Sequence, residues 1–180
     1  KLGLLAWLAV VLPATLLAGV HWQELTANLS DQILATNNLL LIWFVYPLIK
    51  LLHEMGHAYA VKSGDGEVHE MGIMLLVLAP IPYVDATASA GFRSTLRRMV
   101  VGAAGILVEL FLAGLAMWVW ILVEPGLLRS IAFNVLVVAG ASTLLFNGNP
   151  LLRYDGYYVL SDFLEIPNLA AMRAFGTPSA

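Results

Sequence analysis

The 180-residue sequence contains no cysteine, and only 12% of its residues are charged. Without cysteine the chain can form neither a disulfide nor a thiolate metal site, so His, Asp or Glu must hold any metal ion. A soluble domain usually carries about twice this fraction of charged residues. The net charge of -3 is small and speaks against a nucleic-acid partner. Apolar residues take the place of the missing charge: they make up 60% of the chain, and its mean hydropathy is +0.83.

Four segments are apolar and long enough to cross a membrane, which takes about 20 helical residues. We expect these spans at Leu2–Val20, which Pro13 interrupts, and at about Asn38–Lys62, Leu96–Val123 and Leu127–Phe146. The chain then divides into a first transmembrane helix with an extracytoplasmic loop (1–37), a membrane core that carries the polar motifs (38–167) and a tail (168–180).

The segment between the second and third spans, Ser63–Gly91, is not expected to be a membrane helix. Its apolar run Met71–Leu78 is too short to span, and Pro80 and Pro82 each remove a backbone donor. We expect short strands or a re-entrant loop, in which bare backbone packs on protein or lines a wet cavity. The predicted fold class is an all-α polytopic membrane protein with about four transmembrane helices and a small β or re-entrant element between the second and third.

The basic residues predict the orientation in the membrane. Those in or beside the long loop, and those that share its side if four helices alternate, are Lys62, Arg93, Arg97, Arg98, Lys1, Arg153 and Arg173. The opposite loops contain only Arg129. The positive-inside rule therefore places both termini and the long loop in the cytoplasm of a multi-pass protein of the cell inner membrane.

The second span carries the motif His53-Glu54-Met55-Gly56-His57. Histidines at i and i+4 lie on one helix face, with Cβ atoms about 5–6 Å apart, and can bind one zinc ion. The glutamate beside the first histidine is placed to take a proton from a water. A chance match is the alternative, but ionisable residues inside an apolar span are costly and usually functional. We therefore expect His53 and His57 to bind Zn²⁺ and Glu54 to be the general base.

A catalytic zinc site needs a third protein ligand. His21 would lie on the other side of the membrane, and His69 lies in a charged loop. Asp155 is the better candidate, because it follows the fourth span on the same side as His57. From the residues alone, a helix-capping aspartate before Gly156 is equally open.

These residues resemble the site-2 protease family of intramembrane zinc peptidases. That family carries His-Glu-x-x-His on one helix and, two helices later, an Asp-Gly motif whose aspartate is the third zinc ligand. His53, Glu54 and His57 match the first motif, and Asp155-Gly156 matches the second. The resemblance implies hydrolysis of membrane-associated peptides or of transmembrane segments, with Zn²⁺ as cofactor.

The similarity covers roughly Leu39 to Pro167. The stretches Asn149–Tyr158 and Leu164–Asn168 look like a bacterial branch of peptide zinc metalloproteases, whose members often occur with secretion-adaptor-like domains. Such a domain is therefore an implied partner, besides the lipid bilayer and a membrane-embedded substrate. The chain departs from the family in two places. Four residues separate Pro150 from Asp155, and many members carry a polar Asn in the helix between the motifs, whereas this helix carries Glu109.

Four further polar residues are candidates for a substrate contact or for a contact to a ligating histidine. Glu109 could bind zinc, contact a histidine or the substrate, or remain a neutral structural residue. Lys50 could offset the charge of the site or extend to the interface. Asp85 could lie at the mouth of the site or in a turn. Asn149, like Asn147, could bind an extended substrate backbone or cap a helix end.

The main alternative is not an enzyme. The chain could be a non-proteolytic, zinc-binding membrane component of a peptide export or maturation complex. A fourth protein ligand, such as Glu109, would indicate a structural zinc, whereas an open position beside Glu54 would favour the protease. An ion carrier built on Lys50, Glu54 and Glu109 would not explain the spacing of the histidines.

Overall fold

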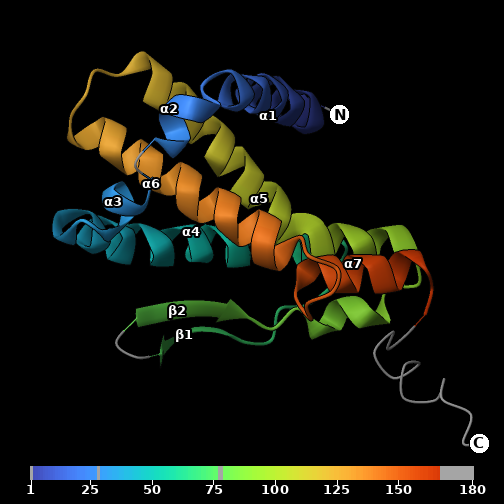
Figure 1. Cartoon of the computed structure of the whole chain (residues 1–180). Helices are drawn as coiled ribbons and strands as arrows, with labels where there is room; N and C mark the ends of the chain where they lie inside the picture. Colours follow the sequence, from blue (N-terminus) through green and yellow to red (C-terminus); the bar gives the residue numbers. More distant parts are fainter. Residues whose placement is uncertain (1, 28, 77–78, 167–180) are drawn as a thin grey trace, which may run out of the picture.

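The computed structural model describes residues 2–27, 29–76 and 79–166, which form a helical bundle with one small hairpin (Figure 1). The long helices are α1 (Leu2–Val20), α4 (Thr36–Ser63), α5 (Thr95–Leu122) and α6 (Leu127–Ala141), the last continued by the π-helix η2 (Ser142–Asn147). Four segments are long and apolar enough to cross a membrane: Leu2–Val20, Asn38–Ser63, Thr95–Leu122 and Leu127–Asn147. The predicted spans and the predicted fold class are confirmed. The predicted tail, 168–180, lies outside the described residues.

Short elements connect these helices. Two of them, α2 (Trp22–Thr26) and α3 (Leu29–Leu34), occupy the stretch that the sequence predicts as a loop. The 3₁₀-helix η1 (Thr87–Gly91) precedes α5, and α7 (Asp155–Phe163) follows η2. Pro13 does not end α1, which continues through it to Val20.

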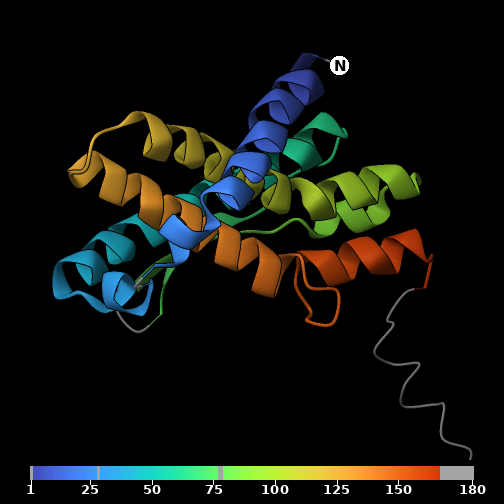
Figure 2. The same cartoon turned by 45° about the horizontal axis from the view of Figure 1, so that its top comes forward.

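Helix α5 is the centre of the bundle and contacts α1, α4, α6 and α7 (Figures 1 and 2). Its last turns pack Met117 and Trp120 against α1 and α6, and Met117 is only 1% exposed. Its first turns pack Val101 and Ala104 against Ala60 and Val61 of α4. Small side chains permit close approach of helices in a membrane. Ala104 and Gly105 therefore lie against the helix that carries the histidine motif, whereas Gly102 faces α7.

The hairpin consists of β1 (Met71–Leu76) and β2 (Ala79–Val84), paired antiparallel from Met71↔Val84 to Leu76↔Ala79. The backbone N–H of Asp85 donates to Glu70 O across the pair, whereas that of Val84 donates to a side chain of α4. Alternate N–H groups point the same way, so positions 80, 82 and 84 face away from β1. Pro80 and Pro82 therefore remove no ladder bond, which explains how a paired strand accommodates two prolines.

Strand β2 lies between α4 and β1, and β1 is the outer edge of the hairpin (Figure 1). Five of the six β1 side chains are exposed, and they are all apolar: Met71, Ile73, Met74, Leu75 and Leu76. The expected β element after the second membrane helix is thus a hairpin with a free apolar edge.

Candidate metal centre

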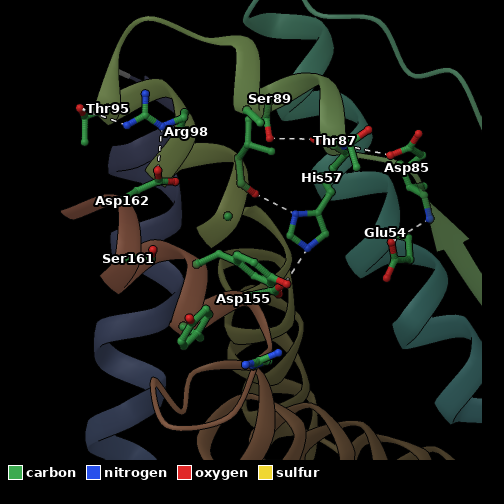
Figure 3. Close-up of a pocket in the computed structure, with 18 of the residues that line it drawn as sticks. Glu54, His57, Asp85, Thr87, Ser89, Thr95, Arg98, Asp155, Ser161 and Asp162 are labelled. Atoms are coloured by element: carbon green, nitrogen blue, oxygen red, sulfur yellow. Dashed lines mark hydrogen bonds and ion pairs between the residues drawn. The ribbon is translucent and has the colours of Figure 1, made fainter. Parts of the chain in front are cut away.

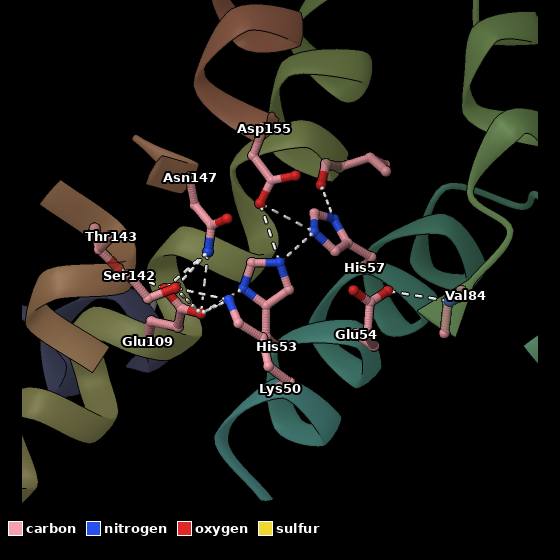
Figure 4. Close-up of polar contacts among 11 residues, drawn as sticks. Lys50, His53, Glu54, His57, Val84, Glu109, Ser142, Thr143, Asn147 and Asp155 are labelled. Atoms are coloured by element: carbon pink, nitrogen blue, oxygen red, sulfur yellow. Dashed lines mark hydrogen bonds and ion pairs between the residues drawn. The ribbon is translucent and has the colours of Figure 1, made fainter. Parts of the chain in front are cut away.

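Two histidines of α4 and the first residue of α7 converge in the bundle (Figure 4). His53 and His57 are buried, with 4% and 7% of their surface exposed. The Nε2 atoms of the two rings are 3.2 Å apart. Asp155 Oδ2 lies 3.1 Å from Nε2 of His53 and 3.3 Å from Nε2 of His57. The three residues predicted as ligands therefore form one compact group.

The triangle of ligand atoms fits a tetrahedral metal ion. With metal–ligand bonds of about 2.0–2.1 Å, a tetrahedron has edges of about 3.3–3.4 Å. Asp155 Oδ2 is also buried and accepts no hydrogen bond, although two ring nitrogens lie beside it. A buried carboxylate oxygen without such a bond is costly unless a cation compensates for it. The group can therefore hold a metal ion.

Helix α5 orients both imidazole rings. His57 Nδ1 donates a hydrogen bond of 2.8 Å to the carbonyl oxygen of Val101, so that in the neutral ring Nε2 carries no proton and faces the centre. Glu109 Oε1 lies 3.1 Å from Nδ1 of His53 without forming a hydrogen bond, and its negative charge favours a proton on that atom. Each ring thus presents Nε2, the atom that can bind a metal.

Glycines permit this close approach of α4 and α5. A Cβ atom at Gly105 would overlap the imidazole ring of His53, so no other residue fits there without moving the ligand. A Cβ atom at Gly56, inside the histidine motif, would lie 2.8 Å from Val108 Cγ2 and 3.1 Å from Ala104 O. The close packing of α4 and α5 and the position of the His53 ring therefore depend on each other.

Glu54 projects beside the histidines toward the hairpin (Figure 4). Its Oε2 atom accepts a hydrogen bond of 3.1 Å from the backbone N–H of Val84, the last residue of β2. The side chain is half-buried and, with His57 and Asp155, lines a cavity of about 1140 Å³. The predicted general base therefore lines the same cavity as two of the predicted ligands, His57 and Asp155.

The cavity extends from these residues along η1, the start of α5 and α7 (Figure 3). Asp85 is part of its wall, and Oδ1 of Asp85 accepts a hydrogen bond of 2.9 Å from the N–H of Thr87. Hydrogen bonds from Thr87 hold the pKa of Asp85 below its usual range. Asp85 is thus both a turn residue and a residue of the cavity, which combines the two roles that the sequence leaves open.

Glu109 does not belong to the ligand group, although it is fully buried. It contacts His53 on one side and Lys50 on the other, and Lys50 Nζ lies 2.7 Å from Glu109 Oε1. Lys50 is therefore directed into the bundle. Asn149 lies in the turn after η2, where its Oδ1 accepts a bond of 2.9 Å from the N–H of Leu151. Asn147, two residues earlier, is the asparagine that contacts Glu109.

Two residues of the site carry no recognisable signal in the sequence. Ser142 and Thr143 both donate to Glu109, but hydroxyl residues are frequent in membrane helices and often bond to their own backbone. Only the π-helical turn of η2 directs them to one carboxylate. That turn could not have been inferred from an ordinary apolar run.

Comparisons of the chain with protein-family models, with curated proteins and with solved structures found no match. The resemblance to the site-2 protease family therefore stays a prediction based on two motifs. What the chain does has to be argued from the residues of the site.

Proposed function

We propose that the chain is an intramembrane zinc metalloprotease that hydrolyses membrane-associated peptides or transmembrane segments. One observation carries the proposal: three ligand atoms with spacings of 3.1–3.3 Å adjoin a cavity that also contains a glutamate. Two imidazole nitrogens and one carboxylate oxygen are a typical donor set of catalytic zinc. The setting in apolar helices supports a reaction within or beside the membrane.

The roles of the residues follow from this arrangement. A zinc ion held by His53, His57 and Asp155 would lower the pKa of a bound water to about 7 and polarise a peptide carbonyl. Glu54 takes a proton from the attacking water and then donates it to the leaving amine. The N–H of Val84 bonds to Oε2 of Glu54 and orients the carboxylate, which leaves Oε1 available for the proton.

The free edge of the hairpin supports a peptide as the substrate. In the observed register, the N–H and C=O groups of Met71, Ile73 and Leu75 point away from β2. An extended peptide can pair with such an edge by strand addition. A substrate segment that has left its helix would there find partners for its own backbone groups, which are costly to expose in lipid.

The number of ligands supports the protease over the non-enzymatic alternative. A structural zinc site usually has four protein ligands. Within the described part of the chain, the group able to hold a metal comprises three residues, and Glu109 is engaged elsewhere. A secretion-adaptor-like partner and a location in the inner membrane with cytoplasmic termini belong to the proposal as well.

A Glu54→Gln variant tests the proposal. We expect near-stoichiometric zinc, by metal analysis of the detergent-purified proteins, in both wild type and variant. Cleavage of a quenched-fluorescent peptide library should fall by at least about 100-fold in the variant, because general acid–base catalysis contributes about 10²–10⁴-fold. Cleavage that survives the substitution would remove Glu54 from its role, and a wild-type protein without zinc would refute the metalloprotease.

A further inference from the structure

Behind the metal ligands lies a second polar cluster, centred on Glu109 (Figure 4). This carboxylate is 0% exposed. The atoms within 3.1 Å of its oxygens are Lys50 Nζ, His53 Nδ1, Ser142 Oγ, Thr143 Oγ1 and Asn147 Nδ2. A buried carboxylate keeps its charge only with a cation and sufficient donors. Lys50 supplies the cation, and η2 supplies most of the donors.

The π-helical turn of η2 brings its three polar residues to one point. On a regular α-helix, residues five apart would point about 140° away from each other. In η2, Asn147 Nδ2 instead lies 3.1 Å from Ser142 Oγ, and both side chains donate to Glu109. Thr143 Oγ1 adds a bond of 2.7 Å to the second carboxylate oxygen. Single π-helical turns are rare and frequent at functional sites.

The end of η2 is also tied to the start of α7. A Cβ atom at Gly156 would lie 2.7 Å from both the carbonyl carbon and the oxygen of Gly148, so the two backbones are in direct contact. Gly148 directly follows Asn147, and Gly156 directly follows Asp155. Whatever fixes Asn147 therefore fixes the position from which Asp155 extends to the histidines.

We propose that Lys50, Glu109, Ser142, Thr143 and Asn147 form a positioning unit for the metal centre, called here the buried clamp. It rests on the proposed metal site. The clamp sets the ring of His53 from one side and the backbone before Asp155 from the other. It thereby joins the two halves of the ligand set, which lie on α4 and α7, without touching the metal or the substrate.

Zinc affinity and protein stability together test the clamp. Zinc affinity is measured by competition with a chromophoric chelator, and the geometry by the absorption spectrum of the cobalt-substituted protein. We expect Glu109→Gln to weaken zinc binding by about 10–100-fold, as loss of a partner of a ligating histidine does, and to change the cobalt spectrum. Lys50→Met leaves the carboxylate without its cation and should lower the thermal midpoint.

The double variant Lys50→Met/Glu109→Gln separates positioning from a purely structural role. It contains no unpaired charge, so its thermal midpoint should return toward that of the wild type, while its zinc affinity stays low. Thr143→Ala should weaken zinc binding as well. Ser130→Ala is the matched hydroxyl control, because Ser130 bonds to Gly126 O in α6 and should leave zinc affinity unchanged.

The possible failures are distinguishable. A double variant that binds zinc with wild-type affinity and an unchanged cobalt spectrum would overturn the clamp but leave the metal site intact. If the double variant does not fold, Thr143→Ala decides by the same criterion. A wild-type protein that binds neither zinc nor cobalt would instead overturn the proposed function.

Discussion

Asp155 shows how one side chain can be assigned only when its surroundings are known. It opens α7, where a capping aspartate is often found, but the residue at the cap position is Tyr154, without a side-chain bond to the helix. The carboxylate of Asp155 is turned toward the two histidines instead. Of the two roles that the sequence leaves open, the geometry agrees with the ligand.

Replacing Asp155 by Ala should weaken zinc binding by more than about 100-fold, because loss of an outer partner alone costs about 10–100-fold. Zinc retention during dialysis against a chelator measures the effect. Asp162→Ala is the matched control on the same helix, since Asp162 pairs with Arg98 at 2.7 Å and makes no contact to the histidines. Equal zinc loss in both variants would show a general disturbance of α7.

Gly105→Ala should displace the imidazole of His53, because the added methyl group would overlap the ring. We expect a sharp loss of zinc affinity in the same dialysis measurement. Gly140→Ala in α6 is the control, since nothing lies within 4 Å of a Cβ atom there, and its zinc affinity should be that of the wild type. Wild-type affinity of Gly105→Ala would mean that the two helices separate easily.

At the scale of these residues, the sequence predicted the group that can hold a metal but not the residues that support it. The spacing of His53 and His57 marked the pair on α4. The residues alone left Asp155 open between a ligand and a helix cap, and its place beside the two rings is seen only in the structure. The contact partner of Glu109 was left open, because a contact between two spans depends on their relative rotation. Ser142 and Thr143 could not be found, since a π-helical turn leaves no mark in the composition of an apolar helix.

Among the elements, the hairpin follows most directly from its residues. Pro80 and Pro82 excluded a helix, and the short run from Met71 excluded a span. The structure adds the register, which places both prolines on the edge of β2 that faces away from β1. It also corrects the expectation of a plain loop before the second span, where α2 and α3 are found.

Ile73→Pro should impair substrate binding at the free edge of β1. The N–H of Ile73 points outward, so its loss removes a bond to an added strand but none to β2. We expect KM for a cleaved library peptide to rise up to about 10-fold, as loss of one hydrogen bond allows, with unchanged zinc content. Ile73→Val, which keeps the N–H, is the control. An unchanged KM for Ile73→Pro would exclude strand addition at this position.

For the whole molecule, hydropathy alone was sufficient to predict the number and the approximate limits of the membrane helices. The runs of apolar residues are long, and the connections carry most of the charge, so the boundaries agree within one or two residues. The central place of α5 was not predictable from hydropathy, because α1 contacts fewer helices than α5 but has almost the same mean hydropathy, 2.1 against 2.2.

Because the sequence has no cysteine, an introduced cysteine is the sole thiol that a reagent can label, so thiol labelling can test the orientation in the membrane. Single cysteines at the exposed positions Asp31 and Glu67 lie on opposite sides of the second span. With cytoplasmic termini, a membrane-impermeant maleimide added to intact cells should label Asp31→Cys, and Glu67→Cys only after permeabilisation. The reverse pattern would invert the predicted orientation.

The hydrogen bond between Glu54 and Val84 restricts where the hairpin can dock. Along the edge of β2 that faces α4, positions 80 and 82 are prolines, so Val84 is the sole residue of that row with an amide hydrogen. If the strand slid so that position 82 lay opposite Glu54, the carboxylate would face Pro82 and find no donor. Within β2, Glu54 is therefore oriented only when Val84 lies opposite it. The two prolines prevent the same hydrogen bond at positions 80 and 82.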